Sequence, residues 1–177
     1  MTIANVNGGQ IAYADAGSGK DVVLLLRAFP LNRGMWSRLV TALEKRHRVI
    51  APDYRGLGKS AASAEPSTME LLAQDVRALL AHVRVERAGV AGLSMGGYLA
   101  FELFRQAPGL FRGIALCDTK AGADTEEGKA GREKFAQTAF EKGRTWVQDE
   151  MVPKLFRPRP DLDAVQEVRS LISSGTP

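Results

Sequence analysis

Several short segments in the first 120 residues have patterns of apolar and polar positions that are typical of strands. Two strand-like segments, 3–6 and 10–14, flank the Asn-Gly-Gly sequence at 7–9, where Asn-Gly accepts the positive φ of a tight hairpin turn. Residues 22–26 (Val-Val-Leu-Leu-Leu) are apolar throughout, as expected of a strand buried on both faces of a parallel sheet. Further short strands are predicted at 48–51, 88–91 and 113–117.

Helical spacing of apolar residues separates these strands. It predicts helices over about 35–45, 72–83 and 95–107. The second helix follows Ser67-Thr68-Met69-Glu70, which has the spacing of a capping box with Ser67 as its N-cap. Alternating strands and helices predict an α/β fold with a doubly wound, mostly parallel sheet.

Beyond residue 118 this alternation stops. Residues 125–148 have helical character, and Asp161 can cap a last helix. We expect the tail to form helices packed over the sheet rather than further strands. The sequence therefore predicts two parts, a core of six strands over 1–120 and a helical cap or tail over 121–177.

Composition excludes several classes of protein. The 177 residues are 45% hydrophobic and 25% charged, which is typical of a globular domain and not of a disordered one. The net charge of +4 comes from scattered residues, which gives no support to nucleic-acid binding. Neither a signal peptide nor a membrane span is visible, so a cytoplasmic protein is expected. Cys117, in an apolar run, is expected to be a buried, inert thiol.

The sequence Gly-Leu-Ser-Met-Gly at 92–96 points to chemistry, because G-x-S-x-G here follows a predicted strand and opens a predicted helix. The serine at such a turn leaves the strand sharply, so the hydroxyl of Ser94 stands clear of the backbone. The following helix aims free N–H groups at the site, among them that of Met95, which favours a developing oxyanion. A glycine-rich turn without chemistry is the alternative. The small neighbours that the turn requires are Gly92, Gly96 and Gly97.

Three motifs in order resemble the α/β-hydrolase family, especially its small esterases, enol-lactonases and cofactor-free haloperoxidases. Residues 25–30 fall at the family's His-Gly oxyanion loop, 53–60 resemble its D-x-R-G-x-G-x-S loop, and 92–97 resemble its nucleophile elbow. The resemblance covers nearly the whole chain. It implies that the N–H of Phe29 is a second oxyanion donor. It also implies that Phe29 and Ser94 meet at the carboxyl ends of adjacent strands, where such sheets bind ligands.

The oxyanion loop departs from the family pattern, and one acid lies where the family's acid can lie. Arg27-Ala28 replaces His-Gly, and the Cβ of Ala28 resists backbone conformations that glycine takes freely. Arg27 pointing into the pocket would hold an anionic substrate, although a solvated or structural arginine is the favoured interpretation. Asp118 follows the last predicted strand, where some family members place their catalytic acid. A capping carboxylate at the strand end is the alternative interpretation of Asp118.

The catalytic histidine of the family has no counterpart after Ser94. The family order is serine, acid, histidine, whereas His47 and His82 both precede Ser94. Both are expected at the far edge of the sheet in structural roles. The family's last two strands are expected to be absent, which leaves a fold truncated after about six strands.

The sequence Gly-Leu-Gly-Lys-Ser at 56–60 resembles the end of a phosphate-binding P-loop. The full motif requires glycine at position 53, which is Asp53, and a helix where residues 61–66 are loop-like. No nucleotide, other cofactor or metal is therefore predicted.

Two functions follow from these observations. The first is a serine hydrolase acting on a carboxylic ester or lactone, impaired because no histidine base follows the nucleophile. The alternative is a truncated, non-catalytic fold that serves as a binding or dimerisation module. In that case the strand 113–117 is an exposed sheet edge, and a homodimer forms through this edge or through exchange of the helical tail. A third interpretation is that the sequence is an incomplete record of a longer enzyme.

Overall fold

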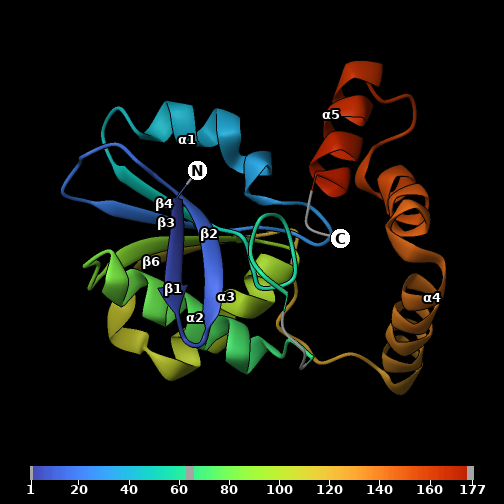
Figure 1. The fold of residues 1–177 in the computed structure, drawn as a ribbon, viewed down its shortest axis with the longest axis horizontal. Coiled ribbons are helices and arrows are strands. Elements are labelled where there is room, and N and C mark those ends of the chain that lie inside the picture. The colour runs from blue at the N-terminus through green and yellow to red at the C-terminus, as the bar shows by residue number, and fades with distance from the viewer. Residues whose placement is uncertain (1, 63–65, 175–177) are drawn as a thin grey trace.

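A six-stranded, mostly parallel sheet forms the centre of the molecule in a computed structural model that describes residues 2–62 and 66–174 (Figure 1). The strand order is β1-β2-β4-β3-β5-β6. β1 and β2 form an antiparallel hairpin, β2 is antiparallel to β4, and the remaining neighbours are parallel. The elements are β1 (Thr2–Val6), β2 (Gly9–Ala16), β3 (Val22–Leu26), the 3₁₀ helix η1 (Arg33–Trp36), α1 (Ser37–Leu43), β4 (Arg48–Pro52), α2 (Met69–His82), β5 (Ala88–Leu93), α3 (Met95–Gln106), the 3₁₀ helix η2 (Pro108–Leu110), β6 (Phe111–Cys117), α4 (Glu126–Met151), the 3₁₀ helix η3 (Val152–Leu155) and α5 (Leu162–Ser173).

Helices cover both faces of this sheet, which confirms the doubly wound α/β class. α1 lies on one face, and α2 and α3 lie on the other (Figure 1). The main core lies between the sheet and α2 and α3, where Leu24, Leu79 and Leu99 are fully buried. A smaller cluster around Leu25 and Val49 packs against α1. The apolar run of β3 thus supplies side chains to both layers, as its continuous hydrophobicity predicts.

The cap of α2 is one residue later than predicted. Thr68, not Ser67, is the N-cap, and its side chain accepts a hydrogen bond from the N–H of Leu71. Three residues after Thr68 comes Leu71 rather than an acid, so the reciprocal bond of a capping box does not form. Glu70 instead lies in the first turn, where a carboxylate favours the positive end of the helix.

β6 is an exposed edge of the sheet, and this overturns the expectation of a buried Cys117. Six of its seven residues are exposed, and Ile114 and Leu116 expose 48% and 42% of their surface. Cys117 is exposed as well. An apolar run predicts burial only where a neighbouring element covers it, and within the described residues β6 pairs with β5 alone.

The tail forms the two predicted helices, although they do not lie over the sheet. α4 and α5 stand beside it (Figure 1), and Val152 and Ile172 pack with Leu31 from the segment after β3. The side chains of Thr125 and Asp161 cap the two helices by accepting hydrogen bonds from the N–H groups of Gly128 and Asp163. The division into a 1–120 core and a 121–177 cap stays a prediction. Within the described residues, no helix is both long enough and apolar enough to cross a membrane.

Candidate active site

Ser94 occupies a strained turn between β5 and α3. Its backbone has φ 51° and ψ −114°, a conformation that residues with a side chain rarely adopt. Three hydrogen bonds hold it: the Ser94 N–H donates to the Cys117 carbonyl at 2.9 Å, and the Ser94 carbonyl accepts from the Gly97 N–H at 2.8 Å and the Thr119 hydroxyl at 2.9 Å. Strain of this kind persists only where the surroundings impose it, and it often marks a functional position.

The neighbouring glycines are required by close backbone packing. A Cβ at Gly92 would lie 2.4 Å from the Gly96 carbonyl oxygen, and a Cβ at Gly96 would lie 2.1 Å from the Leu26 carbonyl oxygen. A Cβ at Gly97 would meet the Thr119 hydroxyl at 2.4 Å. The start of α3 is therefore pressed against the end of β3, which places the turn beside the segment that follows β3.

The predicted oxyanion loop, 25–30, begins at the end of β3, and 27–30 is the part that leaves the strand. Leu26, which precedes it, pairs with Gly92 in the parallel ladder of β3 and β5, so 27–30 and Ser94 leave adjacent strands at the same edge. Met95 is the first residue of α3, where helix N–H groups are free of intrahelical partners. Within 2–62 and 66–174, the Phe29 N–H donates to no hydrogen-bond acceptor. These are the two amides that the sequence assigns to an oxyanion hole.

Arg27 is completely buried instead of facing solvent. Its guanidinium lies over the ring of Tyr54 at 4.1 Å, and its Nη1 donates to the Ala28 carbonyl at 3.2 Å. Burial lowers the pKa of Arg27, an effect that Tyr54 and Asp53 oppose, and burial raises the pKa of Tyr54. This location favours the structural interpretation of Arg27 over direct contact with a substrate.

Asp118 follows β6 at the edge where β5 ends, with φ 43°. Its sequence neighbour Cys117 accepts the hydrogen bond from the Ser94 N–H, so Asp118 directly follows a residue that is bonded to the turn. Its carboxylate is exposed and forms neither a hydrogen bond nor an ion pair with the described residues. Among the described residues, no N–H group bonds to the Asp118 carboxylate as the capping interpretation requires. The role of Asp118 as the catalytic acid stays a prediction.

Neither histidine lies at the edge of Ser94. His47 directly precedes β4, and His82 ends α2, which leads into β5. Both therefore lie at the amino edge of the parallel strands, whereas Ser94 follows the carboxyl end of β5. Six residues of strand separate these edges by about 20 Å, far beyond hydrogen-bond reach.

The P-loop-like segment turns its amides inward around Asp53. The carboxylate of Asp53 accepts from the backbone N–H groups of Lys59, at 3.0 Å, and Arg33, at 2.7 Å. The N–H groups of Gly56 and Leu57 donate to carbonyls of the chain itself. A phosphate cradle needs such amides free, whereas these amides donate within the chain. No group of side chains with metal-ligand character occurs among the described residues.

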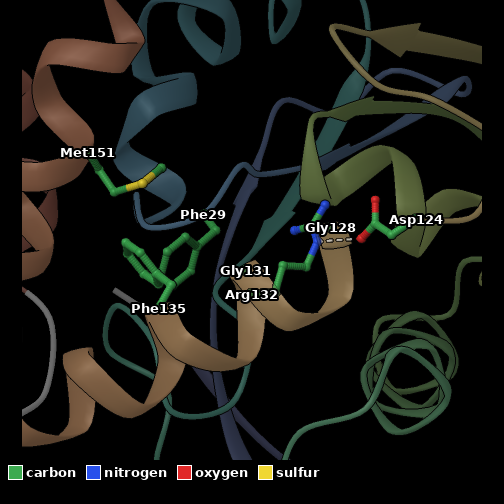
Figure 2. A pocket seen from close by; sticks show the side chains of 7 residues that line it. All are labelled: Phe29, Asp124, Gly128, Gly131, Arg132, Phe135 and Met151. Carbon is green, nitrogen blue, oxygen red and sulfur yellow. Dashed lines mark hydrogen bonds and ion pairs between the residues drawn. The ribbon is translucent and has the colours of Figure 1, made fainter. Parts of the chain in front are cut away.

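A pocket of about 490 Å³ opens between the oxyanion loop and α4 (Figure 2). The ring of Phe29 stands edge-on to Phe135 of α4, with centroids 6.3 Å apart. At the other end Arg132 pairs with Asp124, and the pairing with Arg132 and Lys120 lowers the pKa of Asp124 to about 2. Ser94 is not part of the lining. The lining residues are Phe29, Asp124, Gly128, Gly131, Arg132, Phe135 and Met151.

Most of these lining residues were not identified from the sequence as site residues. Gly128, Arg132 and Phe135 recur at helical spacing on α4, a signal that indicates one shared face. The sequence alone does not show which element that face meets, because α4 follows a loop and packs beside the sheet. Only the position of Phe29 links this face to the predicted oxyanion loop.

This fold, with a strained serine between a parallel strand and a helix, is that of an α/β hydrolase. The family model described as "alpha/beta hydrolase fold" matches residues 21–155, and the chain belongs to this family. Its relatives include hydrolases of several kinds.

Three relatives illustrate the similarity. A soluble epoxide hydrolase of Corynebacterium sp. is 39% identical over 98 residues, which is 55% of this chain and 34% of that protein. An esterase from Thermogutta terrifontis superposes with a TM-score of 0.87 at 33% identity, over 98% of this chain and 66% of that one. The enol-lactonase of Burkholderia xenovorans gives 0.87 at 29% identity, over 97% and 67%. This chain thus spans about a third of the first relative and about two thirds of the two solved structures.

Proposed function

We propose that this chain carries the nucleophile and oxyanion hole of a serine hydrolase that acts on a carboxylic ester or lactone. Ser94 attacks the carbonyl carbon, and the N–H groups of Met95 and Phe29 stabilise the oxyanion that forms. The strained backbone of Ser94 is the observation that carries this proposal, because an ordinary strand-to-helix turn does not require it. The similarity to an esterase and an enol-lactonase supports the choice of ester or lactone.

The second part of the proposal is that the 177-residue chain by itself reacts slowly. A serine hydroxyl without an adjacent base is a weak nucleophile at neutral pH, and both histidines lie at the other edge of the sheet. Removing the histidine of a catalytic triad lowers turnover about 10⁶-fold, while the oxyanion hole and binding retain roughly 10³–10⁴-fold over water. We expect slow acylation of Ser94 and little turnover.

The test is acylation by p-nitrophenyl acetate with imidazole added as an external base. The wild-type chain should gain the mass of one acetyl group. Ser94→Ala should not gain an acetyl group at that rate. Imidazole also cleaves the ester directly. The rate of ester cleavage with Ser94→Ala measures this direct reaction and is subtracted from the wild-type rate. Equal acylation of the two proteins would remove Ser94 from the proposed mechanism.

The exposed edge of β6 favours a second candidate, a binding or dimerisation module. A strand edge with unpaired N–H and C=O groups and exposed Ile114 and Leu116 is a template for pairing with another chain. We expect two copies of this chain to pair through β6. Sedimentation equilibrium should give the mass of a dimer, and Ile114→Lys should shift it toward the monomer. A wild-type monomer at high concentration would exclude this pairing.

Residence in the cytoplasm stays a prediction.

A further inference from the structure

We propose that Arg27 is a positioning residue of the oxyanion hole, which acts by holding and polarising the peptide between Ala28 and Phe29. This inference rests on the proposed function, since it concerns the amide of Phe29. Arg27 does not touch the substrate. It acts through the backbone that does.

The peptide between Ala28 and Phe29 is planar. The Ala28 carbonyl and the Phe29 N–H belong to the same planar group, and in a trans peptide they point in opposite directions. Whatever fixes the carbonyl therefore also aims the N–H. The Ala28 carbonyl accepts two hydrogen bonds, one from Arg27 Nη1 at 3.2 Å and one from the Leu31 N–H at 3.1 Å. The peptide is held from one side, and its N–H is presented on the other.

The donor on the carbonyl side carries a full positive charge. A guanidinium stays protonated at neutral pH, and a hydrogen bond from a charged donor is stronger than one between neutral groups. Hydrogen bonds linked through one peptide polarise each other, so a cation on the carbonyl makes the N–H at the other end a better donor.

Among the described residues, the Ala28 carbonyl is the only hydrogen-bond acceptor of the Arg27 guanidinium. Its side chain is 0% exposed, and within the described residues its Nε and Nη2 have no hydrogen-bond partner. The nearby carboxylate of Asp53 is engaged by Arg33 and by the Lys59 N–H instead. Tyr54 holds the arginine in place, with its ring under the guanidinium and its hydroxyl donating to the Arg27 carbonyl at 3.1 Å.

A buried cation without a hydrogen-bonded carboxylate is costly to the fold, and an apolar side chain of similar length would cost less. A purely structural role predicts that removing the charge leaves the acylation of Ser94 unchanged. A positioning role predicts a stable protein with a poorer oxyanion hole. Arg27→Met separates the two because methionine is unbranched and neutral.

The experiment measures acylation of Ser94 by p-nitrophenyl acetate under single-turnover conditions with imidazole, and resolves the rate constant of acylation from the binding constant. Arg27→Met should lower the acylation rate constant about 10- to 100-fold, with ester binding within about twofold of wild type. Its melting temperature should equal or exceed that of wild type. Arg27→Lys, which keeps the charge, should recover part of the rate.

Nuclear magnetic resonance supplies a readout that does not depend on activity. The carbonyl carbon of Ala28 and the amide of Phe29 should both shift in Arg27→Met, because the carbonyl loses a charged hydrogen-bond donor. Arg27→Lys should shift them less, and this comparison remains available if Arg27→Met fails to fold. Unchanged resonances, or an acylation rate constant within about threefold of wild type, would overturn the role of Arg27 alone. Acylation that does not depend on Ser94 in the wild-type chain would overturn the proposed function as well.

Discussion

Gly96→Ala should lower the free energy of unfolding by about 2–4 kcal/mol, although Gly96 lies in a helix where alanine is the better helix former. The added Cβ would lie 2.1 Å from the carbonyl oxygen of Leu26 and 2.6 Å from its carbonyl carbon. Both are backbone atoms of β3, so no side chain can rotate away to relieve the overlap. Relief requires α3 to move off the sheet, which also displaces Ser94.

Gly131→Ala is the matched control, because Gly131 is also helical and a Cβ there meets nothing within 4 Å. This variant should gain about 0.5–1 kcal/mol from helix propensity alone. Urea denaturation followed by circular dichroism measures both variants. Similar stabilities for the two would show that α3 does not press against β3 as described.

Asp53→Ala should lower the free energy of unfolding by about 3–5 kcal/mol, because it removes one partner of a buried ion pair and leaves Arg33 without its carboxylate. The carboxylate is fully buried, pairs with Arg33, and accepts from the N–H groups of Arg33 and Lys59. It also packs against Gly58, where a Cβ would lie 2.2 Å from the carboxyl carbon. Its loss leaves these two backbone amides without their acceptor.

Asp149→Asn provides the comparison at the surface. Asp149 is 58% exposed in its ion pair with Arg169, and exposed pairs of this kind contribute about 0–1 kcal/mol. Thermal unfolding of the two variants should therefore give a large shift for Asp53→Ala and a small one for Asp149→Asn. A small shift for both would mean that Asp53 is hydrated in solution.

Local patterns were sufficient to predict most of the sheet. The hairpin turn at 7–8, the apolar run of β3 and the glycines of the 92–97 turn are each set by short-range chemistry, and the structure has all three. The parallel neighbours β3 and β5 then place the segment after residue 26 beside Ser94. The positive φ of Ser94 follows from the same turn, so its position in the fold was predictable.

Features that depend on distant neighbours were not predictable. Cys117 is exposed because nothing within the described chain pairs with the outer edge of β6, and its own sequence carries no sign of this. The contact between Phe29 and Phe135 joins segments separated in the sequence by most of the α/β core. The shift of the α2 cap from Ser67 to Thr68 is smaller, since two adjacent residues of similar capping preference compete for one position.

The buried position of Arg27 shows the same limit most clearly. A sequence places an arginine after β3 but does not reveal that Tyr54, from the end of β4, closes over it. From the motif alone, both a pocket-facing and a structural role of Arg27 were therefore consistent with the sequence. The hydrogen bond to the Ala28 carbonyl is visible only once both segments are placed.

Mapping the site of reaction with a fluorophosphonate tests the central claim most directly. Trypsin releases residues 88–105 as one peptide, in which Ser94 is the only serine and Tyr98 the only tyrosine. The account predicts an adduct on this peptide that fragment ions assign to Ser94, formed faster when imidazole is present and absent from Ser94→Ala. An adduct on Tyr98 or on another peptide, or equal labelling of wild type and Ser94→Ala, would contradict it.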